Sequence, residues 1–587
     1  MLRNLYLCFL LFIFVLSLSA EDFPLGKLIQ DGPATPEQIS LYLPVTGELD
    51  ESIIAHVKYK KDGTSKWLIG HPLHRIRPAA TGRKAPKKAY AGVLWDLTSG
   101  TTYNIEVTLK KGDISSVKKI SLKTRTLPPV TGKATTKIAA SSTSAQIQSI
   151  WNAAKPGDII EFANGTYNVD RLQFKTSGSI DKPIVIRGES REGVILKDVK
   201  GNIIQVLECS YITLENLTLE GSGKDSGTKS ASKAVSFWTA SQPQVNFTFR
   251  NLNIRGVDMG IMASKAIRGV LIYDNTFNGN NLWKREIITT NSTWNDDGIR
   301  IPGQGNSCFN NTFYGFGDCL AMNDRVFNVG VHFFRNDILM TGDDAFEGDY
   351  GHRNITFYDN RIQNSQTFIS MDPMLGGPVF CFRNISINTG RGPYKLNNKN
   401  TGLFIYNNTV VRTNGFGSGK SWGWVQFNNG PLVAWGYCNN LLIWHGKGNT
   451  FAMESRGQNP LDFTNNGWYP DKSFWWTGTG GSARSMDAVR KKLPATKPVF
   501  GKSTKRHEND IIIGANQFAE EIKLGPDFLT EIKKQYIPKL SKKSKALGAG
   551  VAIPAVTDGF TGKAPDIGAV ITGRKNPEWG DRSQSKK

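Results

Sequence analysis

Four acidic residues fall within eight positions of the segment "GDDAFEGDYGHRN", which spans residues 342–354. They are Asp343, Asp344, Glu347 and Asp349. Carboxylates gathered in this way can bind Ca²⁺, which takes about six to eight oxygen ligands. They can also supply the acid and base of glycoside hydrolysis, because neighbouring carboxylates keep one another protonated. A third interpretation is that they cap turns by accepting backbone hydrogen bonds.

The tetrapeptide "DDAF" at 343–346 resembles two earlier segments. These are "DDGI" at 296–299 and "GDCL" at 317–320. If the three segments occupy one position of a repeating fold, their aspartates lie on successive repeats. Such carboxylates repel one another, and their pKa values rise unless a cation or a basic side chain opposes them. The pattern therefore favours a functional cluster over isolated turn caps.

The tripeptide Asn-x-hydrophobic supplies the repeat that this fold requires. Successive copies begin at Asn216, Asn251, Asn275, Asn311, Asn336, Asn360, Asn384, Asn408 and Asn440. Four consecutive intervals are 24 or 25 residues long, and the longer intervals leave room for loops. Such a period fits one coil of three short strands, with equivalent residues about 4.8 Å apart in successive coils. The sequence predicts a parallel β-helix in which asparagine side chains form a hydrogen-bonded ladder.

The period also predicts which residues are neighbours. Asp318 and Asp343 each follow a ladder asparagine by seven residues, so we expect them roughly 5 Å apart. Glu347 and Lys395 each follow one by eleven residues, two coils apart, which corresponds to roughly 10 Å. Lys395 would then face the acidic residues, although a lysine can also lie along a surface with its ammonium group in water.

Other segments surround the predicted β-helix, which we place at 144–480. Residues 1–20 combine a basic start, an apolar run and small residues, as in a secretory signal peptide. Residues 21–127 alternate apolar and polar positions and predict an antiparallel β-sandwich. Within them, "LTSGTTYNIEVTL" resembles a segment of fibronectin type III domains. Residues 128–143 are expected to form a linker. Residues 481–587 are expected to form a C-terminal cap that is partly helical, in "ARSMDAVRKKL" and "DFLTEIKKQYI".

Composition indicates the kind of partner. The net charge of +22, without a nucleic-acid-binding motif, favours a polyanionic partner such as an acidic polysaccharide or an anionic surface, and we expect no nucleic-acid partner. Five cysteines remain after the signal peptide, an odd and sparse set that predicts buried thiols. No later stretch is apolar for long enough to span a membrane. We expect a monomer that is secreted or periplasmic.

The segment "SAQIQSIWNAAKPGDIIEFANGTYN" begins with a predicted helix over 144–154. It resembles the cap and first coil of secreted right-handed parallel β-helices of the pectate-lyase type. The next stretch, "ANGTYNVDRLQFKTSGSIDKPIVIRG", is similar to the β-helices of alginate and chondroitin lyases. The expected fold class is therefore all-β, with an N-terminal sandwich and a right-handed parallel β-helix.

Residues 290–410 resemble polysaccharide lyase family nine, whose members are pectate lyases. In that family one Asp, followed a coil later by Asp-Asp-x-x-Asp, binds calcium, and a lysine in a Gly-rich segment removes a proton. The matching residues here are Asp318, Asp343, Asp344, Glu347 in place of the last Asp, and Lys395 in "GPYKLNN". The resemblance implies β-elimination on a uronate, with Ca²⁺ as cofactor and Lys395 as base.

Further residues are expected to assist this chemistry. Arg300 and Arg353 could neutralise the uronate carboxylate, and Arg391 could lower the pKa of Lys395. His352 is an alternative base, because histidine titrates near neutral pH. Aromatic rings stack on sugar faces, although tryptophans can equally cover the flank of the fold. The expected substrate-binding residues are Asp296, Asp297, Arg391, Trp422 and Trp424.

Three other functions remain open at this point. A glycoside hydrolase of the polygalacturonase type also places aspartates on neighbouring coils, and "GDYGHRN" partly matches its "GHG" motif. A C5-epimerase shares the proton abstraction. A non-catalytic glycan-binding β-helix would use the carboxylates only as structural calcium ligands.

Overall fold

The computed structural model describes most of the chain between residues 23 and 583. The gaps are 51, 78–87, 130–131, 224–231, 239–240, 242, 281–282, 284–295, 323–325, 399, 414–424, 427–435, 447–461, 473, 477–480, 493–498 and 501–504. The predicted signal peptide and the side chains of Trp422 and Trp424 lie outside the described residues. Among those described, no helix has both the length and the apolar character that a membrane crossing requires.

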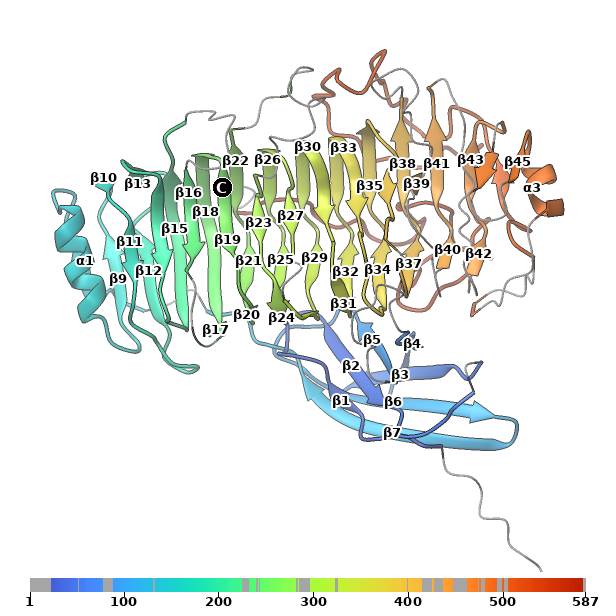
Figure 1. Ribbon diagram of the computed structural model, residues 1–587, viewed down its shortest axis with the longest axis horizontal. Helices are drawn as coiled ribbons and strands as arrows, with labels where there is room; N and C mark the ends of the chain where they lie inside the picture. Colours follow the sequence, from blue (N-terminus) through green and yellow to red (C-terminus); the bar gives the residue numbers. More distant parts are fainter. Residues whose placement is uncertain are drawn as a thin grey trace, which may run out of the picture.

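The N-terminal domain consists of seven antiparallel strands in the order β1-β2-β5-β4-β3-β6-β7 (Figure 1). Their bounds are β1 Ile29–Gln30, β2 Ile39–Pro44, β3 Ala55–Lys61, β4 Leu68–Arg75, β5 Ala89–Leu94, β6 Thr102–Lys111 and β7 Ile114–Lys123. Alternate residues such as Leu41, Val57 and Val107 share one buried core. The Tyr103 hydroxyl accepts a hydrogen bond from the backbone nitrogen of Thr98 at 2.9 Å. This tie fits the predicted turn, while the fibronectin type III likeness stays a prediction.

Most of the remaining described strands coil into a long parallel β-helix (Figure 1), which confirms the predicted fold class. Strands β44 Phe474–Trp476 and β45 Gly481–Ala483 form a separate antiparallel pair. Its first row of paired strands comprises β8 Thr136–Ile138, β9 Ile159–Phe162, β12 Ile184–Gly188, the start of β15 Ile212–Glu220 and of β18 Phe247–Val257, β21 Leu271–Tyr273, β25 Ser307–Phe309, β29 His332–Phe334, β32 Ile355–Tyr358, β34 Val379–Phe382, β37 Leu403–Tyr406, β40 Gly436–Cys438 and β42 Asp462–Thr464.

The second row follows the first around a bend in each coil. It comprises β10 Gly165–Val169, β13 Val194–Asp198, the ends of β15 and β18, β22 Thr276–Gly279, β26 Thr312–Phe316, the start of β30 Asp337–Glu347 and of β33 Arg361–Ser370, β35 Ile385–Thr389, β38 Thr409–Arg412, β41 Leu441–Trp444, β43 Gly467–Tyr469 and β46 Ile511–Ile512.

The third row carries the predicted site. It comprises β11 Leu172–Phe174, β14 Asn202–Val206, β16 Lys233–Phe237, β19 Met259–Ala263, β23 Ile299–Arg300, β27 Leu320–Ala321, the ends of β30 and β33, β36 Tyr394–Lys395 and β39 Val425–Gln426. A separate short sheet comprises β17 Gln244–Val245, β20 Ile267–Arg268, β24 Gly303–Gln304, β28 Asn328–Val329 and β31 Gly351–Arg353.

The predicted asparagine ladder is present at the bend between the first two rows. The side-chain amide nitrogen of Asn336 donates to Asn360 Oδ1, Asn360 to Asn384, and Asn384 to Asn408, at 2.9–3.0 Å. Asn275 and Asn311 precede this series, and Asn440 and Asn466 continue it. All are fully buried. Each coil therefore fixes the register of the next.

The two earliest predicted members, Asn216 and Asn251, lie outside this column, although Asn251 Nδ2 donates to Asn216 Oδ1 at 2.7 Å. Leu217 and Leu252 pair across β15 and β18, and the backbone nitrogen of Leu252 donates to Asn275 Oδ1. Asn216 and Asn251 therefore stand one residue earlier, where φ is +56° and +51°. Asparagine adopts this left-handed backbone conformation more readily than most residues. The positive φ accounts for asparagine at these two positions, which differ from the ladder positions.

The ladder ends at a carboxylate. Asp510 Oδ1 accepts a hydrogen bond from the backbone nitrogen of Asn466 at 2.8 Å, and Oδ2 accepts from Trp468 Nε1 at 2.6 Å. His507 Nδ1 lies 2.6 Å from the same Oδ2. All these groups are buried. The last amide of the series thereby meets a group that accepts hydrogen bonds.

The start of the β-helix is covered as predicted. Helix α1, Ser144–Ala153, begins with Thr143 as N-cap in a capping box with Gln146, and it buries Ile147 and Trp151. The parallel pairing nevertheless extends beyond 144–480, because β8 precedes the helix and β46 pairs with β43. The five described cysteines are buried and free, as expected.

The C-terminal segment differs from the predicted cap. Helix α3, Met486–Lys492, is present, but "DFLTEIKKQYI" is irregular. Its residues Ile532 and Tyr536 pack on strands of the second row. The chain then runs back along the β-helix (Figure 1), so that Asp581 bonds to Arg191 near the first coils. Ile532 and Tyr536 are spaced as in an amphipathic helix, but here they anchor an irregular segment against the β-helix.

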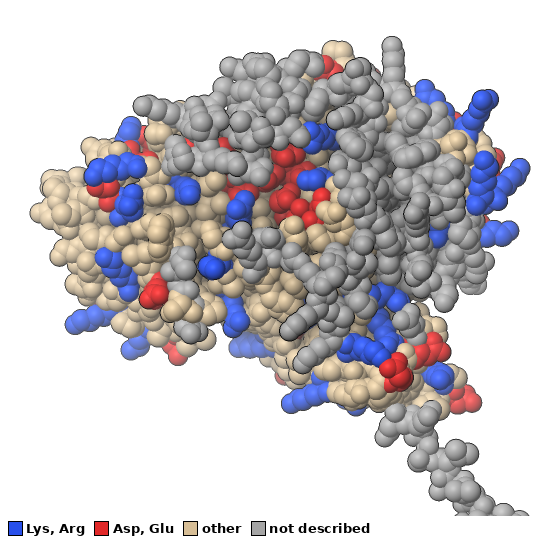
Figure 2. All heavy atoms as spheres, in the orientation of Figure 1, with Lys and Arg blue, Asp and Glu red and all other residues tan. Residues whose placement is uncertain are grey.

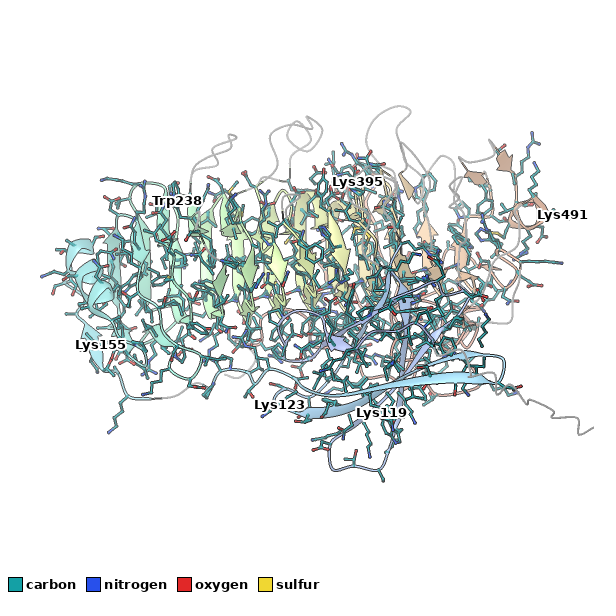
Figure 3. All side chains as sticks on the ribbon, turned by 60° about the horizontal axis from the view of Figure 1, so that its bottom comes forward. Lys119, Lys123, Lys155, Trp238, Lys395 and Lys491 are labelled. Atoms are coloured by element: carbon teal, nitrogen blue, oxygen red, sulfur yellow. The ribbon has the colours of Figure 1, made fainter. Side chains whose placement is uncertain are left out.

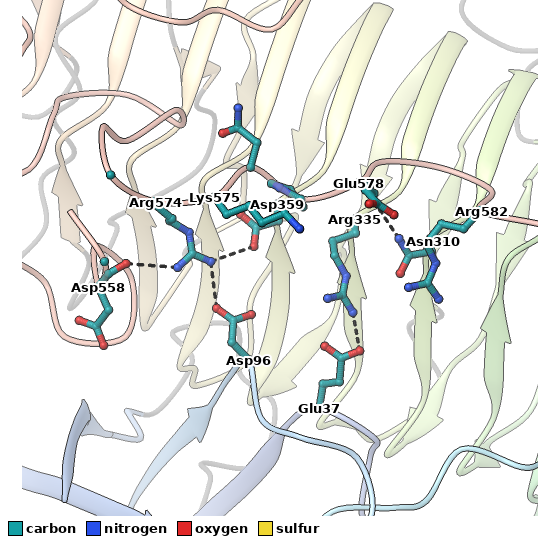
Figure 4. Close-up of a pocket in the computed structure, with 14 residues that line it drawn as sticks. Glu37, Asp96, Asn310, Arg335, Asp359, Asp558, Arg574, Lys575, Glu578 and Arg582 are labelled. Atoms are coloured by element: carbon teal, nitrogen blue, oxygen red, sulfur yellow. Dashed lines mark hydrogen bonds and ion pairs between the residues drawn. The ribbon is translucent and has the colours of Figure 1, made fainter. Parts of the chain in front are cut away.

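The N-terminal domain is fixed to the middle coils by aromatic and charged contacts. Trp95 packs edge-on against Phe380 and Phe382, with ring centroids 4.8 Å apart in both cases. Figure 4 shows a cavity of about 610 Å³ where this domain, the β-helix and the C-terminal segment meet. There Asp96 bridges Arg383 and Arg574 at 3.1 and 3.0 Å. Three distant parts of the chain therefore share one ion-pair network.

Candidate functional site

One line of residues on the third row joins the predicted site. Arg300 pairs with Ala321, Ala321 with Glu347, Glu347 with Ser370, and Ser370 with Lys395. The predicted relation between Glu347 and Lys395, two coils apart in one line, is confirmed. These backbone pairs place Arg300 and Lys395 on either side of Glu347.

The aspartates form a neighbouring line. Ile299 pairs with Leu320, and Leu320 with Phe346, so Asp297, Asp318 and Asp344 each lie two residues before a paired apolar residue. "DDGI", "GDCL" and "DDAF" thus occupy one position, as predicted. Asp318 aligns with Asp344 and not with Asp343, because the register of β30 shifts between Thr341 and Asp344. The extra residue of such a bulge cannot be predicted from the spacing of the asparagine repeat.

Three carboxylates meet at this point. Oxygen atoms of Asp318, Asp343 and Asp344 all lie within 4.8 Å of one another. Asp318 and Asp344 are buried, and the Asp343 side chain is 29% exposed. The backbone nitrogen of Asp344 donates to Asp318 Oδ1 at 3.2 Å. Figure 2 shows acidic atoms gathered over the middle of the β-helix with basic side chains beside them.

Basic side chains border the acidic cluster. Lys395 Nζ lies 3.0 Å from Asp344 Oδ2, and Arg391 Nη1 lies 3.9 Å from Asp343 Oδ1. Arg300 Nη2 lies 2.5 Å from Asp297 Oδ2. The structure thus brings Arg300, Arg391 and Lys395 to this surface, as the sequence predicted.

Burial controls the protonation of the carboxyl groups. It raises the pKa of Asp343 to about 7, with a further contribution from Asp344 and opposition from Lys395 and Arg391. It also raises the pKa of Asp297 to about 6, against the effect of Arg300. Burial and neighbouring carboxylates raise the pKa of Asp318 and of Glu347 well above their ordinary values. The cluster therefore retains protons near neutral pH when no cation is bound.

The pKa of Lys395 moves opposite to the expected direction. Burial disfavours its charged form, but Asp344, Glu347, Asp349 and Asp343 outweigh burial and raise the pKa above its ordinary value. The expectation that Lys395 has a lowered pKa is therefore wrong, because the effect of the carboxylates dominates. Conversely, Lys395 and hydrogen bonds overcome burial and hold the pKa of Asp344 below its ordinary value.

His352 and Arg353 lie elsewhere. They belong to β31, in the separate short sheet. Arg353 forms two hydrogen bonds to Asp31 of the N-terminal domain, at 2.8 and 2.7 Å. The His352 ring packs on Phe327, and its Nδ1 accepts a hydrogen bond from the backbone nitrogen of Asn328. The bend after Glu347 carries both residues away from the carboxylates, which removes the reason to expect them in the site.

Asp349 joins the site although we assigned it no role. Its Oδ1 accepts hydrogen bonds from Ser370 Oγ and from the backbone nitrogen of Asp372, both at 2.7 Å. Burial raises its pKa to about 6, against the effect of Lys395. Its membership of the same acidic run was the available signal. Ser370, which stands between Glu347 and Lys395, had no such signal.

The three clustered aspartates suit a cation. Asp343 Oδ1 and Asp344 Oδ1 are buried and accept no hydrogen bond. Buried polar oxygens without partners are costly, and a divalent cation would supply a partner for both. Glu347 lies outside this close group of three, although its charge interacts with Asp318 and Asp344. The residues present therefore fit an oxygen-liganded cation with a smaller ligand set than predicted.

Comparison with known proteins gives partial matches. Residues 141–314 match the sequence profile of the family described as Chondroitinase B. No curated protein sequence matches the chain. A family 6 polysaccharide lyase from Pseudopedobacter saltans aligns at 11% identity over 69% of this chain and all of its own, with a TM-score of 0.39.

Two further solved structures have similar scores. The family 6 alginate lyase AlyGC aligns at 14% identity over 59% of this chain and 55% of its own, with a TM-score of 0.34. The A-module of a mannuronan C-5 epimerase from Azotobacter vinelandii aligns at 14% identity over 57% and 93%, with a TM-score of 0.37. This chain thus spans about half the length of AlyGC.

The profile match agrees with the sequence prediction of a polysaccharide lyase. It covers less than a third of the chain and ends before Asp318. The resemblance to family nine, calcium binding and the role of Lys395 therefore remain predictions.

Proposed function

We propose that this chain is a polysaccharide lyase that cleaves a uronate-containing acidic polysaccharide by β-elimination. The observation that carries the proposal is the position of Lys395, 3.0 Å from Asp344 at the edge of a three-aspartate cluster. A base beside a group that can bind a cation is what this reaction requires. The profile match to Chondroitinase B supports the same reaction class.

The reaction begins with the C5 proton of a uronate. This proton is weakly acidic, and its removal becomes feasible when the adjacent carboxylate is neutralised, since the developing negative charge is then stabilised. Arg300 and Arg391 border the site and are the residues that we assign to the substrate carboxylate. Lys395 removes the proton, the electron pair left on C5 forms the C4–C5 double bond, and the bond from C4 to the glycosidic oxygen breaks. The leaving oxygen takes a proton from solvent.

Asp318, Asp343 and Asp344 are the residues that would hold Ca²⁺. When bound, the ion supplies positive charge for the substrate carboxylate and offsets the aspartates that hold Lys395 protonated. Asp343 and Asp344 thus bind the cation and, without it, raise the pKa of Lys395. The acidic residues that would oppose catalysis are the same ones that recruit the cation.

A glycoside hydrolase is the second candidate. The raised pKa of Asp343, about 7, suits a general acid near neutral pH. However, carboxyl groups in inverting hydrolases stand about 6.5–9.5 Å apart to admit a water molecule, and here three carboxylate oxygens lie within 4.8 Å. That spacing favours a shared cation. A C5-epimerase would share the proton abstraction and differs in returning a proton to the sugar.

The test is a screen of polyuronates and glycosaminoglycans, including pectate, alginate and chondroitin. We expect ultraviolet absorbance from an unsaturated uronate product, its loss with excess chelator, and its return with Ca²⁺. New reducing ends without absorbance would indicate a hydrolase, and altered uronate composition without cleavage an epimerase. Full turnover in excess chelator would exclude the proposed cation. The absence of any reaction would leave a glycan-binding β-helix.

We further propose that the protein acts outside the cytoplasm, in line with the predicted signal peptide and an acidic polysaccharide as partner. A monomeric state is part of the same proposal. Both follow from the sequence reasoning, and size-exclusion chromatography and fractionation of the producing cells would test them.

A further inference from the structure

Strands β3, β6 and β7 of the N-terminal domain lie on its side away from the β-helix (Figure 1). Residues alternate along them, so that Val57, Ile105 and Val107 are buried in the domain core. The intervening residues point outward, among them Lys58 and Lys60 of β3 and Lys119 and Lys123 of β7. We call the surface formed by Lys58, Lys60, Trp67, Ile69, Val117, Lys119 and Lys123 the lysine face.

Pairing registers show that the lysine face is continuous. Lys58 of β3 pairs with Ile69 of β4 on one side and Glu106 of β6 on the other. Glu106 in turn pairs with Lys119 of β7. A single row of outward side chains therefore crosses four strands. Trp67 precedes Ile69 by two residues and extends the same side of the sheet.

The lysine face is basic. Its four lysines, Lys58, Lys60, Lys119 and Lys123, outnumber the two acidic residues beside them, Glu106 and Asp62, and Asp62 accepts a hydrogen bond from Asn104 of β6 at 2.9 Å. One of the acids, Glu106, already pairs with Lys58 at 2.7 Å and Lys119 at 3.1 Å. The Lys119 side chain is 70% exposed. The excess charge faces solvent and attracts a polyanion.

Apolar groups lie among these charges. Lys58 Nζ and Lys60 Nζ lie 4.6 and 5.2 Å from the centroid of the Trp67 ring. Ile69 and Val117 are 61% and 45% exposed. A sugar ring can stack on an indole while its carboxylate pairs with an adjacent ammonium group. Inorganic phosphate would use only the charges, whereas an acidic sugar would use both features.

We infer that the lysine face is a second binding site for an anionic polysaccharide, separate from the cluster around Lys395. The identity of this ligand rests on the substrate class of the proposed function. Figure 3 shows Lys119 and Lys123 on the N-terminal domain and Lys395 at the far edge of the β-helix. Polymer held at the lysine face therefore leaves the other site free for a different stretch of chain. Such anchoring raises the local concentration of substrate.

The test measures retention of the full chain in affinity gels that contain pectate, alginate or chondroitin sulfate, with neutral dextran as reference. All proteins carry Lys395→Ala, so that turnover does not alter the gel. The face variant combines Lys60→Ser, Lys119→Ser and Lys123→Ser. The matched control combines Lys533→Ser, Lys542→Ser and Lys543→Ser, which removes the same charge from exposed positions elsewhere.

We expect the face variant to bind acidic gels about tenfold more weakly, since each exposed ion pair contributes about 0.2–1 kcal/mol. The control should stay within about twofold of the parent, and Trp67→Ala alone should also weaken binding. Equal loss in the face variant and the control would overturn the inference, because it would show that only net charge matters. Stronger retention by anionic lipid vesicles, lost with the same residues, would overturn the assigned ligand. Thermal melting of each variant verifies that it is folded, and Lys123→Glu is the replacement if the triple variant is not.

This result is separable from the proposed function. Cleavage is measured separately, on the parent protein that keeps Lys395. Retention that depends on the lysine face, together with no cleavage of any polyuronate by this parent, would leave the binding site standing and reject the lyase. Normal cleavage by the parent, together with retention that does not depend on the lysine face, would do the reverse.

Discussion

Asp344 connects the two chemical parts of the candidate site. Its Oδ2 accepts a hydrogen bond from Lys395, while its Oδ1 is buried without a hydrogen-bond partner beside Asp318 and Asp343. One side chain therefore faces both the candidate base and the candidate cation site. Removing Lys395 should therefore change how tightly the aspartates bind a cation. A lysine that served only in a structural ion pair would not be expected to affect both catalysis and cation binding.

We predict that Lys395→Ala lowers kcat by roughly 10²–10⁴-fold, the usual contribution of a positioned general base. The same variant should bind Ca²⁺ at least as tightly as the parent, because Asp344 loses a competing ammonium group. Lys395→Arg should restore little activity, since guanidinium hardly deprotonates near neutral pH. Steady-state kinetics and calcium titration calorimetry measure the two effects. Parent-like kcat in the alanine variant would reject Lys395 as the base.

At the scale of elements, the asparagine period predicted the third-row neighbours well. It placed Glu347 and Lys395 in one line and joined the three aspartate segments, because a fixed coil length converts sequence distance into height. It failed at Asp343, where a bulge adds a residue. His352 and Arg353 were proposed from their side-chain chemistry alone, and the chain leaves the third row through a bend before it reaches them. Neither event changes hydrophobic periodicity. The irregular segment that contains Ile532 and Tyr536 was likewise indistinguishable from an amphipathic helix.

The ladder itself should contribute measurably to stability. Asn384 donates to Asn408 Oδ1 and to the Phe357 carbonyl oxygen, and it accepts from Asn360. We predict that Asn384→Ala lowers the free energy of unfolding by roughly 1–3 kcal/mol for each buried group left without a partner. Urea denaturation measures this change. The exposed Asn168 is the control, and Asn168→Ala should change stability by less than about 0.5 kcal/mol.

At the scale of the whole molecule, the N-terminal domain is held by both the β-helix and the C-terminal segment. Arg383 is fully buried and pairs with Asp359 at 2.7 Å and with Asp96 at 3.1 Å. Arg574 reaches the same Asp96 from the other end of the sequence. This arrangement orients the lysine face relative to the β-helix. The sequence offered no signal for it, since the partners lie hundreds of residues apart.

We predict that Arg383→Met destabilises the protein by roughly 3 kcal/mol, because the buried carboxylate of Asp359 loses its 2.7 Å partner and keeps only Arg574, at 3.6 Å. Loosening of the domain contact should also speed tryptic cleavage at Lys133, in the linker between the two domains. The control is Arg255→Met, which removes a partly exposed pair with Glu220 and should cost no more than about 1 kcal/mol. Unchanged cleavage at Lys133 would show that the network does not hold the domains together.

The carboxylate of Asp510 gives the asparagine ladder a direction. Each ladder asparagine donates its side-chain amide to the asparagine of the next coil. An additional coil of about 24 residues inserted in the middle would therefore have a hydrogen-bond donor on one side and an acceptor on the other. The final position is different, because both Asp510 oxygens accept hydrogen bonds there and no amide is passed on to a further coil. The β-helix can therefore lengthen by duplication of internal coils, while Asp510 still ends the ladder. Coil number, and with it the length of polymer that the β-helix can span, is open to evolutionary change without redesign of either end.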